Sequence, residues 1–243
     1  MLLLILLIEL VILFLLSRYV TQFLYGLFLL LFRSRSIAIS FTTILFFPGT
    51  VVHELAHLFT AEVLGVHTGK LSLVPENLEE EEIQAGSVQI AKSDPFRRYA
   101  IGFAPLIIGL IILAALSYWL PPLLQQATEA ARSGNLFNSS PTYLVSLLIY
   151  LLFVVSNSMF SSKEDLKGFL AFAITIGILI AAGYIAGIRI GITGTALEVI
   201  NRILDGLVKS TGLVLAINGV LLLLLKVLLK LSSKILHRSF KFS

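Results

Sequence analysis

The chain has 243 residues, of which 57% are hydrophobic and 13% are charged, and its formal net charge is +4. Soluble globular domains carry about twice that share of charged residues, so the composition excludes an ordinary soluble domain and indicates an integral membrane protein. Cysteine is absent, which excludes disulfide bonds and thiolate metal sites, so any metal must be held by histidine and carboxylate side chains.

Apolar runs of about 20 residues or more recur along the chain, and a helix of that length crosses the roughly 30 Å hydrocarbon core of a bilayer. The sequence therefore predicts an all-α polytopic membrane protein with about six transmembrane helices. We expect the first over Leu2 to Phe32, as a retained anchor, because it lacks the basic start and cleavage site of a secretory signal. The second is expected from Ile37 to Val66, with Pro48 and Gly49 bending it or starting a new helix.

A polar insert, residues 67–98, separates the second span from the third. The alternating stretch SVQIA, residues 87–91, predicts a short strand within this insert. The third span is expected from Tyr99 to Leu120, where Pro121 and Pro122 should stop it.

The second half of the chain predicts three further apolar helices joined by polar links. We expect spans over Pro141 to Phe160, Phe169 to Ile190 and Leu213 to Leu231, with residues 192–210 at the membrane interface. The whole chain, residues 1–243, is then a single membrane domain. It consists of an N-terminal anchor (1–32), a catalytic core (about 37–190) and a C-terminal helix with a basic tail (211–243). The basic residues of the tail are expected to bind the anionic lipids of one membrane leaflet and not nucleic acid.

The stretch HELAH, residues 53–57, matches the pattern H-E-x-x-H on an expected transmembrane helix. Residues i and i+4 share a helix face, so His53 and His57 can bind one zinc ion together, with Glu54 beside it as a general base. Ionisable residues are costly inside a bilayer and are by default functional or paired there. The motif therefore predicts a zinc hydrolase site and makes a merely structural polar cluster the less favoured interpretation.

A catalytic zinc site usually has three protein ligands and a water, so a third ligand is expected at the same depth. The helix order returns the loop SSKEDLKG to the side of the motif, which makes Glu164 and Asp165 the nearest downstream carboxylates. Ser161 and Glu164 have capping-box spacing, which leaves Asp165 for the metal. Glu198 and Asp205 are less favoured because their segment follows a further crossing.

The chain resembles the site-2 protease family of intramembrane zinc metalloproteases over roughly residues 45 to 170. The resemblance rests on HELAHLFTAEVLGV from His53, on GFAPL at residues 102–106, and on Asn157 followed eight residues later by Asp165. It implies that Asp165 is the third zinc ligand and that Asn157 lies in the catalytic site. It also implies regulated intramembrane proteolysis as the activity.

The chain departs from that family's pattern at three points, which indicates a divergent branch. Phe160 stands where the family has proline, and Leu166 and Lys167 follow Asp165 in place of glycine. Ile108 and Gly109 follow the GFAPL element, where the family has asparagine.

The function predicted from the sequence is zinc-dependent endoproteolysis of membrane protein or peptide substrates, within or beside their transmembrane segments. Two alternatives stay open: a different membrane zincin, of the prenyl-protein endopeptidase type, whose third ligand is a glutamate such as Glu198, and a non-catalytic membrane scaffold that keeps the motif.

Basic residues in the expected loops are more numerous on the side of the motif, which favours a cytoplasmic site. This count assumes six spans and places Lys234 on the motif's side, with Arg202 and Lys209 opposite.

Overall fold

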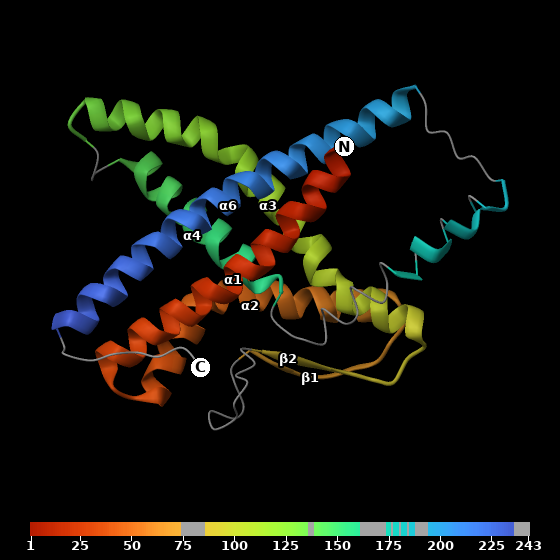
Figure 1. Ribbon diagram of the computed structural model, residues 1–243, viewed down its shortest axis with the longest axis horizontal. Coiled ribbons are helices and arrows are strands. Elements are labelled where there is room, and N and C mark those ends of the chain that lie inside the picture. The colour runs from red at the N-terminus through yellow and green to blue at the C-terminus, as the bar shows by residue number, and fades with distance from the viewer. Residues whose placement is uncertain are drawn as a thin grey trace.

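The computed structural model describes residues 1–73, 86–135, 139–160, 174–175, 177–179, 181–183, 185–187 and 194–235. Within these residues the protein is a bundle of long helices with one small sheet beside it (Figure 1). The long helices are α1 (Leu2–Phe32), α2 (Arg35–Val63), α3 (Pro95–Arg132), α4 (Ser140–Ser158) and α6 (Thr195–Ile235). The strands β1 (Thr68–Ser72) and β2 (Ser87–Ile90) pair antiparallel, with Leu71 opposite Val88 and Ser72 opposite Ser87.

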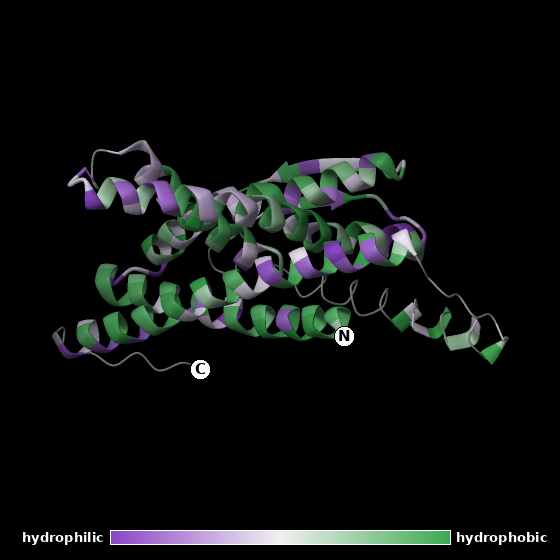
Figure 2. Ribbon diagram, turned by 90° about the horizontal axis from the view of Figure 1, so that it is seen from above, coloured by the Kyte–Doolittle hydropathy of each residue, from purple (hydrophilic) through white to green (hydrophobic). Residues whose placement is uncertain are grey.

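Five of the described helices are long and apolar enough to cross a membrane, as expected of a multi-pass membrane protein. Apolar residues cover most of the helix surfaces, and hydrophilic residues occur at helix ends and as shorter stretches within the helices (Figure 2). The predicted first and fourth spans and the strand at residues 87–91 are confirmed as α1, α4 and β2. Half of the predicted fifth span, residues 169–190, falls outside the described residues, and its described residues 174–175, 177–179, 181–183 and 185 are helical.

The predicted stop of the third span at Pro121 and Pro122 is wrong, because α3 continues through both prolines to Arg132. A proline removes its own N–H from the helix and crowds the preceding turn, which bends a helix without necessarily ending it. The second half of α3 runs in a different direction from the first (Figure 1). Residues 125–132, expected to be a polar link, are therefore helical.

The expected start of the last helix at Leu213 is also wrong, because residues 195–235 form the single helix α6. Polar side chains in its first half find partners within the helix itself. Lys209 Nζ lies 2.6 Å from Asp205 Oδ2, and the hydroxyls of Ser210 and Thr211 both donate to the Leu207 carbonyl. These contacts, at spacings of three and four residues, suit continuous helix.

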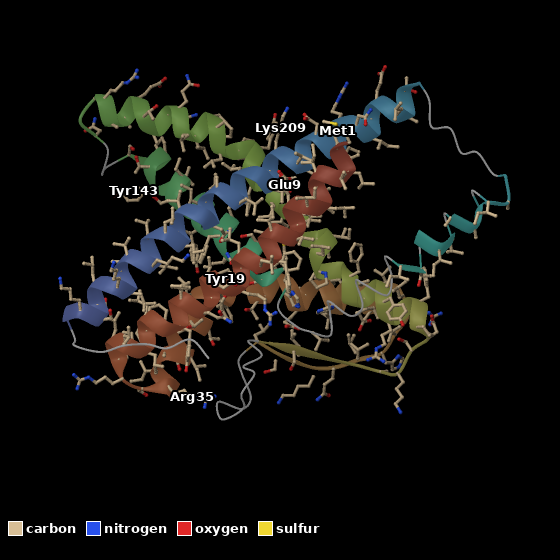
Figure 3. The ribbon with its side chains drawn as sticks, in the orientation of Figure 1. Met1, Glu9, Tyr19, Arg35, Tyr143 and Lys209 are labelled. Atoms are coloured by element: carbon tan, nitrogen blue, oxygen red, sulfur yellow. The ribbon has the colours of Figure 1, made fainter. Side chains whose placement is uncertain are left out.

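The helices α1 and α6 pack side by side and run in the same direction. Glu9 lies opposite Gly212, where an added Cβ would be 3.3 Å from Glu9 Oε1, and the Lys226 ammonium lies 5.7 Å from the centre of the Phe23 ring. Both contacts advance by fourteen residues in the same sense (23 − 9 and 226 − 212), which only a parallel pair allows. Met1 and Lys209 accordingly lie near one end of the pair (Figure 3).

The parallel packing corrects the placement of Lys234, which was expected on the side of the zinc motif. Lys234 lies near the end of α6, and that end is beside the turn from α1 to α2, with Arg33 and Arg35. Arg202 and Lys209 lie at the opposite end. The basic residues that the structure describes are therefore spread over both ends of the bundle and do not assign the site to one side of the membrane.

Helix α2 passes through Pro48 without interruption. A proline within a helix disturbs the hydrogen bonding of the preceding turn, and in a membrane the freed carbonyls need donors from neighbouring helices. The carbonyl that Pro48 leaves without its helical donor is that of Ile44, four residues earlier, and the Tyr150 hydroxyl of α4 donates at 2.8 Å to the next carbonyl, that of Leu45. This bond fixes α4 against α2 two turns before the HELAH motif.

The mutation Tyr150→Phe is expected to lower the free energy of unfolding by about 1 kcal/mol, because it removes the donating hydroxyl and keeps the ring. The midpoint of denaturation in detergent measures the effect. Tyr118→Phe is the matched control, since Tyr118 is 76% exposed. Equal midpoints for wild type and Tyr150→Phe would show that the bond contributes nothing to stability.

Candidate metal centre

The HELAH motif lies in the second half of α2, and its three ionisable side chains are buried. His53 and Glu54 are 3% and 4% exposed, and His57 is 8% exposed. Residues four apart share a helix face, so both imidazoles project from the same side of α2. Burial of such groups costs free energy unless they are hydrogen-bonded or bind a metal, so the three side chains must have partners within the protein.

The two imidazole rings meet through their Nε2 atoms, which are 3.2 Å apart. The ring centroids are 4.8 Å apart and the ring planes are nearly perpendicular, at 83°. Two nitrogen ligands of one tetrahedral zinc, each about 2.0 to 2.1 Å from the metal, are about 3.3 Å apart. The pair therefore fits a shared zinc ion, although a direct hydrogen bond between the rings would have a similar length.

A backbone carbonyl fixes the orientation of the His57 ring. His57 Nδ1 lies 2.9 Å from the carbonyl oxygen of Ile101 in α3. A carbonyl only accepts, so Nδ1 carries the proton and a neutral His57 has its lone pair on Nε2, toward His53. Metal-binding histidines characteristically donate their other ring N–H to such an acceptor, and this second contact favours the metal interpretation.

The first turns of α3 are held in place by local features of the sequence, and they carry Ile101 to His57. The Asp94 carboxylate accepts the backbone N–H of Arg97 at 3.0 Å as an N-cap, and Pro95 occupies the first position of the helix. The Ile101 side chain packs with Ala61 and Val66 from the end of α2 and the turn after it. The cap and this cluster together set the position of the carbonyl that orients His57.

Helix α4 crosses α2 one turn before His53, at Gly49. A Cβ added at Gly49 would collide with the carbonyl of Val154 and the hydroxyl of Ser158. Only glycine permits this close approach, and small residues are the usual contact points between membrane helices. Because Gly49 and His53 are four residues apart, the face of α2 that carries the imidazoles also packs against α4.

The polypeptide leading into β2 covers Glu54. A Cβ added at Gly86 would lie 2.9 Å from Glu54 Cγ, 2.9 Å from Glu54 Oε1 and 2.9 Å from Thr50 Cγ2. The backbone at Gly86 therefore lies directly against the carboxylate, and the edge of the sheet begins one residue later at Ser87. The small sheet is thus anchored next to the proposed general base.

Asn157 lies near the end of α4, one residue before Ser158, and is 8% exposed. Its Nδ2 donates to the Phe153 carbonyl at 2.7 Å and to Asn218 Oδ1 of α6 at 2.6 Å. The described contacts of Asn157 thus connect α4 to α6, and no bond to the HELAH side chains is among them. Asn218 was not among the residues expected at a site, although its single amide inside the apolar run LVLAINGVLLLLL is a signal of a buried polar contact.

The proposed third ligand, Asp165, lies outside the described residues, as does Glu164. Within the part of the chain that the structure does describe, no group of three or more histidine, aspartate or glutamate side chains is placed to hold a metal. The structure therefore brings together two of the three predicted ligands, His53 and His57, with Glu54 adjacent. The role of Asp165 stays a prediction.

The two less favoured carboxylates have other surroundings. Asp205 forms its ion pair with Lys209 on an exposed face of α6. Glu198 is exposed in the first turn of α6, where a negative charge is favourable beside the helix N-terminus.

Comparison of the chain with models of known protein families, with curated proteins and with solved structures found no match. Architecture alone would not identify an activity, because one helical fold can host unrelated functions. Function is therefore inferred from the residues of the site and their geometry.

The mutation His57→Ala is expected to lower the bound zinc of the purified protein at least about tenfold, because it removes one of two converging imidazoles. Zinc per chain is measured by mass spectrometry of the metal after dialysis. The control is His67→Ala, which changes an exposed histidine just beyond the end of α2. Equal zinc content in His57→Ala and wild type would exclude a site built on these rings.

Proposed function

We propose that the protein is a zinc-dependent endopeptidase that hydrolyses peptide bonds within or beside the transmembrane segments of membrane proteins or peptides. The observation that carries the proposal is the buried pair His53 and His57, with Nε2 atoms 3.2 Å apart on an apolar helix and Glu54 between them in sequence. The bond from His57 Nδ1 to the Ile101 carbonyl supports it, because it places the proton on Nδ1 and the lone pair of the neutral ring on Nε2, the atom that faces His53.

The chemistry divides between the metal and the protein. When bound, zinc would act as a Lewis acid that lowers the pKa of water, so that hydroxide would be available at neutral pH to attack an amide. His53, His57 and, by proposal, Asp165 would hold it. Glu54 would take the proton from the attacking water and deliver it to the leaving amine, and its burial excludes bulk water that would compete for the proton.

The substrate class follows from the position of the site. The motif lies within a helix long and apolar enough to span a membrane, and α3 and α4 pack around it. A peptide that reaches Glu54 must therefore enter from within the bilayer or from its edge. Its own helix must open first, because an intact helix keeps its carbonyls in internal hydrogen bonds.

Two other functions stay open, and the described contacts bear on one of them. A membrane zincin whose third ligand is a glutamate would need Glu198 or a similar residue at the imidazoles, and Glu198 is exposed in the first turn of α6. A scaffold without activity would have no need for a zinc ion or for Glu54. The two predictions below separate these alternatives from the proposal.

The mutation Glu54→Gln is expected to lower turnover about 10²- to 10⁴-fold and to leave zinc content unchanged, because it removes the base but keeps the shape of the side chain. Turnover is measured by mass spectrometry of a mixture of single-span peptides in vesicles with the purified protein. Glu62→Gln, an exposed change two turns further along α2, is the control. Equal cleavage by Glu54→Gln and wild type, or no zinc-dependent cleavage by wild type, would end the proposal.

Zinc retention in Asp165→Ala and Glu198→Ala distinguishes the two kinds of zincin. Asp165→Ala is expected to lose zinc at least about tenfold more readily than wild type during dialysis against a chelator, whereas Glu198→Ala should retain it. The reverse result would assign the third ligand to Glu198 and favour the alternative enzyme class.

A further inference from the structure

A polar cluster of three buried side chains joins α4 to α6 inside the apolar core. Ser156 and Asn218 are fully buried, at 0% exposed, and Asn157 is 8% exposed. Asn157 Nδ2 lies 2.6 Å from Asn218 Oδ1, and Asn218 Nδ2 lies 3.0 Å from Ser156 Oγ. These residues are about 60 positions apart in sequence, so their contact exists only in the folded bundle.

Two backbone carbonyls determine which way each amide points. The group of Asn157 that faces the Phe153 carbonyl, at 2.7 Å, must be the donating Nδ2, because a carbonyl cannot donate. The group of Asn218 that faces the Val214 carbonyl, at 3.1 Å, must likewise be Nδ2. Asn218 therefore presents Oδ1 to Asn157, and the Asn157 amide is held by both of its N–H groups.

With its Nδ2 group engaged in both bonds, the Asn157 amide still has one acceptor, Oδ1, without a described partner. Asn157 Oδ1 is buried and has no hydrogen-bond partner among the described residues. An unsatisfied buried acceptor destabilises a protein, so such an atom calls for an explanation in terms of function. The next residue, Ser158, contacts Gly49 one turn before His53, so Asn157 lies at the level of α4 where this helix packs against the metal-binding helix, with its amide directed toward α6.

We propose that Asn218 is a positioning residue, which holds the Asn157 amide so that Oδ1 accepts a backbone N–H of the opened substrate. A peptide that unwinds in a low-dielectric site exposes N–H groups that need acceptors, and a pre-oriented amide oxygen supplies one without reorganisation. This inference rests on the proposed endopeptidase activity. Asn218 acts only through Asn157 and does not touch the substrate.

The test compares Asn157→Leu, Asn218→Leu and the double variant in cleavage of a peptide selected from the vesicle assay, with activity expressed per zinc-loaded chain. Each single variant is expected to lower kcat/KM about tenfold. The double variant should be no slower than Asn157→Leu, because Asn218 acts through the same group. Asn218→Gln, which keeps an amide, should restore part of the activity, and Asn201→Leu, at an exposed position of α6, should match wild type.

Three results would overturn the inference: unchanged kcat/KM in Asn218→Leu, a further tenfold loss in the double variant, or no recovery in Asn218→Gln. The pairing is also measured without substrate, from the denaturation midpoints of the same proteins. The two single changes should lower the midpoint by amounts that do not add, and additive shifts would show that the amides are not partners. A wild type that binds zinc but cleaves nothing would instead refute the proposed function, whatever the midpoints show.

Discussion

Inside a hydrocarbon layer, a backbone or side-chain polar group has no water to bond with, and each unsatisfied group costs several kcal/mol. This constraint explains the main features of the protein. The long segments are helical because helices satisfy their own backbone. Where a proline disturbs a helix, another helix adds a donor nearby, as Tyr150 does at the Leu45 carbonyl before Pro48. The same requirement governs His57 and Asn157, whose ring and amide are oriented by groups from α3 and α6.

The constraint also connects stability to the proposed chemistry. The Ile101 carbonyl that orients His57 belongs to an early turn of α3, and that turn is set by the Asp94 cap and by apolar packing against the end of α2. Close approach at Gly49 brings α4 against the same face. The site is thus held by three helices, and none of the groups that orient it belongs to the HELAH motif itself.

The sequence predicted the type and position of the spans well where apolar runs ended at charged or turn residues. The bounds of α1 agree with the prediction, and α4 agrees within two residues at its end. Prediction failed at Pro121 and Pro122 and in the first half of α6, where local helix-breaking or polar signals suggested boundaries. Tertiary packing and contacts within the helix overrode those signals. The direction of α6 beside α1 was also beyond prediction, since it depends on how many segments cross before it.

By itself, the sequence determined that the chain forms helices long and apolar enough to cross a membrane, and that His53 and His57 share a face with Glu54 next to them, because hydropathy and helical spacing are local properties. Only the tertiary structure brought the Ile101 carbonyl to His57, Gly86 to Glu54 and Asn218 to Asn157. These contacts join residues between 32 and 61 positions apart. Such pairs depend on helix crossings that no local pattern encodes, and they decide how the groups of the site are oriented.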